Sequence, residues 1–143
     1  HAALAKLLEE TRQRFGCAVL IDCHSMPSAA AIPDTVLGDR YGMAASHALM
    51  RKAERDFERA GFTVARNTPY AGGYSTHLHG QPMLGQHALQ IEINRALYLD
   101  EERIEPNARF HEVAKRIADA LRGLTAMEPS LLRPSGARPL AAE

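Results

Sequence analysis

Four consecutive polar or small residues, Asp22, Cys23, His24 and Ser25, follow an apolar run at residues 17–21 that is typical of a buried parallel strand. Ligands of open α/β sheets bind at the carboxyl ends of such strands. If the extended backbone continues, Asp22 and His24 face the same way, and the carboxylate can hold the imidazole in a metal-binding tautomer. The alternative is a hydrogen-bonding cluster where the strand leaves the core.

Glu92 is the second candidate, because it lies inside an otherwise apolar strand pattern at residues 87–94. The alternation places Gln90, Glu92 and Asn94 on one face of that strand. A carboxylate beside a metal can take a proton from water and pass it to a leaving amine. The alternative is a solvated strand face.

The third candidate is the segment 67–77, in which the adjacent Gly72 and Gly73 allow a ligand to approach the backbone closely. Its hydrogen-bond donors are Tyr70, Thr76 and His77. A plain surface loop with a glycine turn is the alternative. His77 and His79 give a weak metal signal, because no third ligand lies nearby in the sequence.

Arg95 follows Glu92 by three residues and has the geometry to bind a carboxylate bidentately, although many such arginines form surface ion pairs. The pair Asp39 and Arg40 is a weaker candidate on local grounds. Nucleophilic catalysis by Cys23 or Ser25 is disfavoured, because neither residue lies in a recognised nucleophile turn.

The surrounding pattern predicts the elements that position these residues. Periodicity and stop signals predict helices at residues 2–15, 41–60 and about 107–123, and strands at 17–21, 62–65 and 87–94. Loops are expected at 29–39 and 67–73, and the tail 125–143 is expected to be disordered. The order is that of an α/β domain with a mostly parallel sheet flanked by helices.

Composition excludes several classes of partner. The 143 residues carry 17 Lys and Arg and 17 Asp and Glu, so no basic surplus indicates binding to nucleic acid or an anionic membrane. No apolar run is long enough to span a membrane. Two cysteines, Cys17 and Cys23, lie in or beside one strand, which favours reduced thiols and a cytoplasmic location. The sequence does not specify an oligomeric state.

Four blocks in order, at residues 20–28, 38–42, 72–74 and 89–98, resemble the N-formylglutamate amidohydrolases over about residues 1–124. The resemblance implies zinc-dependent hydrolysis of N-formyl-L-glutamate to formate and L-glutamate, a step of histidine degradation. That family is similar to the zinc carboxypeptidases, which implies their phosphorylase/hydrolase-like fold. The resemblance also implies His24 as a metal ligand and Glu92 as the general base, and strand alternation makes Asp22 the expected supporting carboxylate. The substrate-binding residues that the resemblance implies are Arg40, Asn67, Tyr70, Gly72, Gly73 and Arg95, and we also expect the hydrogen-bond donor Thr76 to bind the substrate.

The zinc carboxypeptidases take two further ligands from an early His-x-x-Glu motif, which this sequence lacks. We therefore expect the remaining zinc ligands to lie outside this segment, and residues 1–124 to be the C-terminal portion of a larger amidohydrolase-like domain. Two alternatives stay open. One is a non-catalytic binding module or incomplete fragment of the same fold, and the other is a related metal amidase that acts on another N-acyl amino acid.

Overall fold

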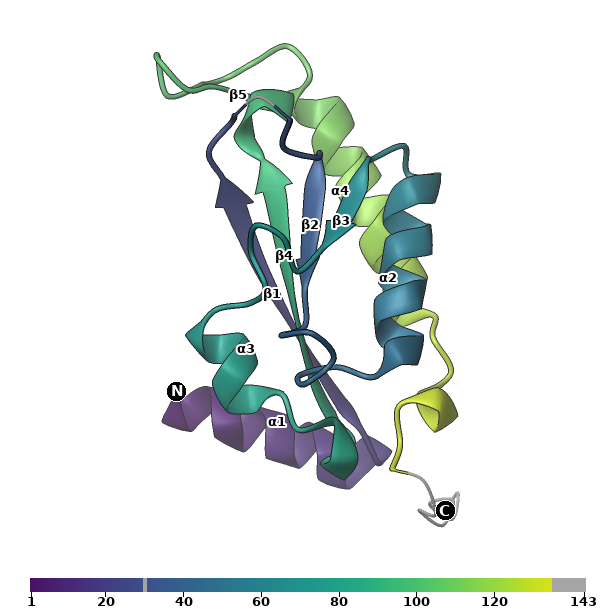
Figure 1. The fold of residues 1–143 in the computed structure, drawn as a ribbon. Coiled ribbons are helices and arrows are strands. Elements are labelled where there is room, and N and C mark those ends of the chain that lie inside the picture. The colour runs from purple at the N-terminus through teal and green to yellow at the C-terminus, as the bar shows by residue number, and fades with distance from the viewer. Residues whose placement is uncertain (30, 135–143) are drawn as a thin grey trace.

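A four-stranded sheet with helices on both faces forms the centre of the molecule (Figure 1). The structure is a computed structural model that describes residues 1–29 and 31–134. The strands of this sheet are β1 (Ala18–Met26), β2 (Thr35–Gly38), β3 (Val64–Arg66) and β4 (Gln86–Asn94). The helices are α1 (Ala2–Phe15), α2 (His47–Arg59), α3 (Tyr74–His79) and α4 (Phe110–Thr125). The short strands β5 (Leu99–Asp100) and β6 (Glu105–Pro106) pair separately.

The strand order is β1-β4-β2-β3, and the β1–β4 and β2–β3 pairs are parallel. Only the central β2–β4 pair is antiparallel, so the predicted α/β fold with a mostly parallel sheet is confirmed. Strand β2 lies in the segment 29–39 that we predicted to be a loop, and that prediction is wrong. All four residues of β2 are buried, but so short a strand shows no measurable period in the sequence.

Different helices pack on the two faces of the sheet. Leu89, Ile91 and Ile93 of β4 pack into the hydrophobic core, which also includes residues of α2 and α4. The alternate residues Gln90, Glu92 and Asn94 therefore face the side on which α3 lies (Figure 1). Strand β4 thus separates an apolar core from a buried polar face.

Two helix boundaries differ from the prediction. Helix α2 begins at His47 rather than near residue 41, because the side chain of Ser46 accepts a hydrogen bond from the Leu49 backbone and caps the helix there. Helix α4 continues through Gly123 to Thr125. Gly123 is a packing position, since a Cβ there would lie 2.4 Å from Oδ2 of Asp56. Helix α3 was not predicted.

The expected disorder of the tail is wrong for its first residues. The short helix η3 (Pro129–Leu131) precedes Leu132, which is buried in the core. The carbonyl of Leu132 accepts a hydrogen bond from Nε2 of His87, 2.8 Å away. The remainder of the predicted tail, residues 135–143, lies outside the described residues.

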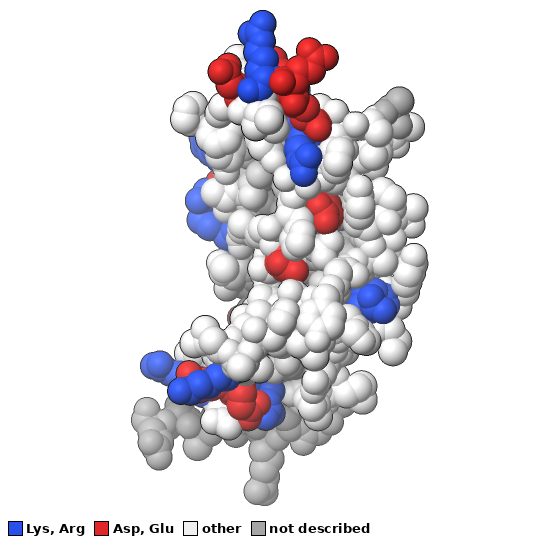
Figure 2. All heavy atoms as spheres, turned by 90° about the vertical axis from the view of Figure 1, so that its left-hand side faces the viewer, with Lys and Arg blue, Asp and Glu red and all other residues white. Residues whose placement is uncertain are grey.

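Strand β1 is an edge strand of the sheet within the described residues. Beside it lies an apolar groove of about 750 Å³, whose lining includes Val19, Ile21, Leu121 and Leu124. Seen from this side, charged side chains gather toward the two ends of the molecule, and the middle is mostly uncharged (Figure 2). In the described part of the chain, no helix combines the length and apolar character needed to cross a membrane.

Candidate active site

His24 and Glu92 lie opposite each other on adjacent strands. Strand β1 continues to Met26, so His24 belongs to the strand and not to the loop after it. The β1–β4 register pairs His24 with Glu92 and Asp22 with Gln90, so these four side chains share one face. Nδ1 of His24 lies 3.8 Å from Oε1 of Glu92. The proposed metal ligand and the proposed base, predicted from segments 68 residues apart, are therefore neighbours.

The second nitrogen of His24 faces Asp22, as the alternation predicted. Nε2 of His24 lies 3.0 Å from Oδ1 of Asp22. A carboxylate beside Nε2 favours a proton on that nitrogen, which leaves the lone pair of Nδ1 directed toward the Glu92 side. The His24 side chain is 47% exposed, so it is accessible to an ion or a substrate.

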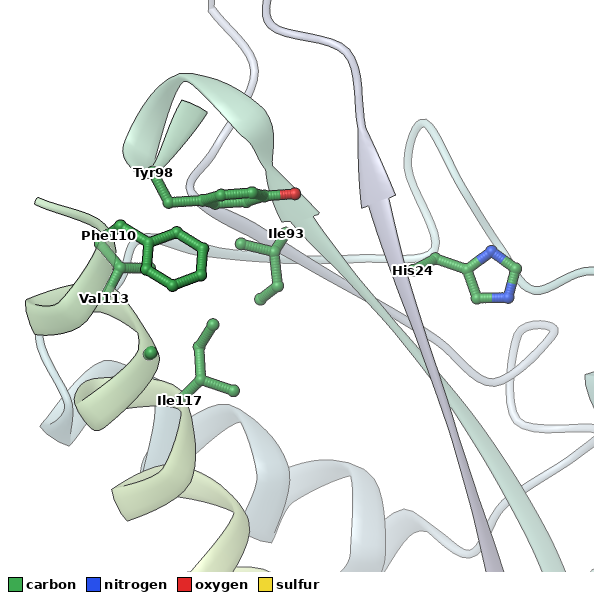
Figure 3. A pocket seen from close by; sticks show the side chains of 7 residues that line it. His24, Ile93, Tyr98, Phe110, Val113 and Ile117 are labelled. Atoms are coloured by element: carbon green, nitrogen blue, oxygen red, sulfur yellow. The ribbon is translucent and has the colours of Figure 1, made fainter. Parts of the chain in front are cut away.

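An apolar cavity of about 220 Å³ behind this region is not the site. Its lining includes Ile93, Tyr98, Phe110 and Ile117, together with His24 at one edge. The imidazole of His24 points away from these side chains (Figure 3). Apart from His24, the lining of this cavity is aliphatic or aromatic and carries no carboxylate, lysine or arginine.

Glu92 is buried, with 6% of its surface exposed, and it is held by one neighbour on its own strand. Nε2 of Gln90 donates a hydrogen bond to Oε1 of Glu92 over 2.7 Å. Oε1 of Gln90 accepts a hydrogen bond from the Gly73 backbone, also over 2.7 Å. A buried carboxylate with a polar partner is the environment expected of a positioned base rather than of a solvated strand face.

Residues 71–73, the glycine segment, cross the end of β2 beside Gln90. The backbone N–H of Arg40 donates to the carbonyl of Ala71 over 2.7 Å, and the Arg40 side chain reaches the carbonyl of Gly72 at 3.4 Å. Gly38 permits this crossing, because a Cβ there would lie 2.7 Å from backbone atoms of Ala71 and Gly72. Gly72 and Gly73 therefore lie at the edge of the site, and their binding of a substrate stays a prediction.

Arg40 projects from a turn with left-handed backbone, in which Arg40 and Tyr41 have φ values of 55° and 57°. Asn67 stabilises this turn. Its Oδ1 accepts hydrogen bonds from the backbones of Asp39 (3.0 Å) and Tyr41 (3.2 Å), and its Nδ2 donates to Oδ1 of Asp39 (2.9 Å). The amide of Asn67 is thus engaged in holding Arg40 rather than presented to a substrate.

Three other predicted substrate-binding residues occupy different positions. Arg95 donates to the hydroxyl of Ser25 at 3.3 Å, and Ser25 points to the opposite face of β1 from its neighbour His24. The structure therefore favours Arg40 over Arg95 for binding a substrate carboxylate. Thr76 is completely buried against Gly72 and is not accessible to a substrate, which corrects its predicted role. Tyr70 is exposed.

The opposite orientations of His24 and Ser25 also disfavour a serine nucleophile activated by this histidine. Gln90 was missed as a candidate site residue, whereas Asp39 was a weak candidate beside Arg40. The alternation around Glu92 is a signal that can identify Gln90, because residues two apart on a strand share a face. The contact of Asp39 with Asn67, 28 residues later, could not be predicted from alternation, because it depends on tertiary structure.

The described residues do not by themselves form a metal site. Among residues 1–29 and 31–134, no three His, Cys, Asp or Glu side chains converge in a way that could hold a metal ion. His79 instead lies beside His1, with ring nitrogens 3.3 Å apart. A catalytic zinc usually has three protein ligands, so His24 fits as one member of a set that needs other contributors.

The family model described as N-formylglutamate amidohydrolase matches residues 1–99. The chain belongs to this family. Among curated members, the N-formylglutamate deformylase of Pseudomonas aeruginosa is 32% identical over 109 residues, covering 71% of this chain and 41% of that protein. The corresponding protein of Pseudomonas putida is 30% identical over 108 residues, covering 71% of this chain and 40% of that protein.

A solved member of the family has the same fold. The crystal structure of N-formylglutamate amidohydrolase from Ralstonia eutropha JMP134 superposes with a TM-score of 0.78 at 36% identity. The match covers 87% of this chain and 48% of that one. The chain thus spans about two fifths of the length of the curated N-formylglutamate deformylases and about half of the crystallised amidohydrolase.

Proposed function

We propose that the protein to which this chain belongs hydrolyses N-formyl-L-glutamate to formate and L-glutamate with the help of zinc. The observation that carries the proposal is the pairing of Glu92 with His24 on one sheet face, with Nδ1 and Oε1 3.8 Å apart. Family membership supports the reaction class, because the relatives are named for the hydrolysis of this formyl amide.

Glu92 acts as the general base in this proposal. Its carboxylate takes a proton from the attacking water and returns it to the departing amino group, so that the C–N bond breaks and formate is released. Zinc, when bound by His24 and ligands from outside this chain, polarises the formyl carbonyl and acidifies the water. Asp22 keeps the His24 ring in the orientation that this role requires.

Arg40 is the proposed partner for a substrate carboxylate. A guanidinium binds a carboxylate through two parallel hydrogen bonds, and Arg40 comes from the turn beside the glycine segment. Gly72 and Gly73 allow the substrate to approach the backbone, and Tyr70 is accessible at the surface.

The proposed role in histidine degradation depends on N-formyl-L-glutamate as the substrate. A cytoplasmic location is a separate proposal that rests on Cys17 and Cys23, both free thiols. Burial raises the pKa of each of these thiols above its ordinary value, which disfavours the reactive thiolate form.

Formate release from N-formyl-L-glutamate by the purified full-length protein tests the proposed reaction. The assay should be run after chelation and again after zinc is restored, with N-acetyl-L-glutamate as a comparison substrate. We expect formate production that disappears with the metal and returns with it. Turnover of the acetyl compound alone would indicate a related amidase, and turnover of neither would indicate a non-catalytic module.

A further inference from the structure

Gln90 lies between the proposed base and the glycine segment, and it is almost completely buried, with 4% of its surface exposed. Its amide spans the two through hydrogen bonds of 2.7 Å on each side. In the described part of the chain, Gln90 is the only donor to the Glu92 carboxylate. The residue therefore connects two parts of the site that are far apart in sequence.

The direction of both hydrogen bonds is fixed by chemistry. The backbone nitrogen of Gly73 can only donate, so it requires the oxygen of the Gln90 amide. The NH₂ group must then face Glu92, and because this group can only donate, the Oε1 atom of Glu92 must accept. A rotated amide would set two donors against each other at Gly73.

We propose that Gln90 is a positioning residue for the hydrolysis proposed above, and this inference rests on that function. The NH₂ group of Gln90 donates to Oε1 of Glu92. The other carboxylate oxygen is therefore free to accept a proton from the water. The side-chain carbonyl of Gln90 accepts the hydrogen bond from Gly73. Gln90 thus fixes the position of the Glu92 carboxylate relative to the backbone that faces the substrate. Position matters here because a small misplacement of a catalytic group costs a large factor in rate.

Two substitutions separate the two hydrogen bonds. Gln90→Glu keeps the shape and the acceptor for Gly73 but replaces the donor to Glu92 with a carboxylate. Gln90→Met removes both partners without adding charge. We expect kcat to fall about tenfold to a hundredfold in both variants, the range of a lost hydrogen bond to a charged group. KM should stay near the wild-type value in Gln90→Glu and rise in Gln90→Met, because only the second variant releases Gly73.

Gln86→Glu is a matched control, because it makes the same change on the same strand. The Gln86 side chain donates to the carbonyl of His79 over 2.7 Å, away from Glu92. A purely structural role for Gln90 predicts that Gln86→Glu and Gln90→Glu change stability and kcat alike. The positioning role predicts that only Gln90→Glu loses kcat at matched thermal stability.

Hydrogen exchange at the Gly73 amide tests the geometry independently of activity. The full-length protein should show protection of this amide in wild type and Gln90→Glu, and faster exchange in Gln90→Met. Equal exchange in all three would overturn the assigned amide orientation, and a Gln90→Glu variant with at least half of wild-type kcat would overturn the positioning role. An inactive wild type with the expected exchange pattern would refute the proposed function, and with it the catalytic part of this inference.

Discussion

At the scale of single residues, the chemistry depends on which atom of His24 faces which neighbour. Asp22 lies 3.0 Å from Nε2, and Glu92 lies 3.8 Å from Nδ1 on the other side of the ring. The spacing of Asp22 and His24 could be interpreted from sequence alone, because strand alternation is local. The approach of Glu92 could not be obtained from spacing, since it depends on how β1 and β4 pair.

Replacing His24 tests its role as a ligand. We expect His24→Ala in the full-length protein to lose most of its zinc, because removing one of three protein ligands leaves the ion poorly held. Metal analysis of wild type and variant measures this loss. His111→Ala, in the exposed first turn of α4, is the control and should keep its zinc. Full zinc content in His24→Ala would refute the assignment.

At the scale of elements, the long periodic segments were predictable and the short ones were not. Helix α1 and strand β4 agree with prediction within one residue, because amphipathic and alternating patterns identify them. Strand β2 and helix α3 are too short to show a period. Their positions are determined by tertiary contacts, such as the close approach of Ala71 to Gly38.

Gly38 provides a test of that approach. In Gly38→Ala, the new Cβ would lie 2.7 Å from backbone atoms of the glycine segment, so this segment must move away from the sheet. We expect a loss of about 1–3 kcal/mol in the free energy of unfolding, the range for overpacking, together with a higher KM. Thermal unfolding and steady-state kinetics measure the two effects.

Gly80→Ala is a matched control for this substitution. Its Cβ would lie 2.4 Å from Ala44, so a backbone clash of similar severity occurs away from the glycine segment. Stability should fall in both variants, whereas KM should rise only in Gly38→Ala. A normal KM in Gly38→Ala would show that the crossing of Ala71 and Gly72 over β2 does not shape the substrate site.

At the scale of the whole molecule, His87 connects the C-terminal segment to α2. Its Nδ1 accepts from the Ser46 backbone (3.1 Å) and its Nε2 donates to the carbonyl of Leu132 (2.8 Å). Burial lowers the pKa of His87 below its ordinary value, although the hydrogen bond to Leu132 opposes this change. The neutral ring fits both partners, since a protonated Nδ1 would face another donor.

This burial predicts a pH-dependent stability. The pKa of His87 is lower in the folded than in the unfolded state, so the unfolded state binds more protons below about pH 6.5. The stabilisation is present above that pH and should be lost as the pH falls, by up to about 1.4 kcal/mol per pH unit for one proton. The free energy of unfolding, measured with urea at several pH values between 5 and 8, should depend less steeply on pH in His87→Gln than in wild type. The same pH dependence of the free energy of unfolding in both proteins would refute this explanation. His111→Gln serves as the exposed control.

Glu92 is the proposed base of the hydrolysis, and the substitution Glu92→Gln is the sharpest test of that role. The amide keeps the shape of the side chain and can still accept a hydrogen bond from Gln90, but it cannot take a proton from water. Formate release from N-formyl-L-glutamate should be measured for the full-length wild type and variant at matched zinc content, with the exposed Glu112→Gln as control. We predict a fall in kcat of about a hundredfold to ten-thousandfold with little change in zinc content or folding. A Glu92→Gln protein that retains more than about a tenth of wild-type kcat would contradict the account, because a general base contributes more than that to the rate.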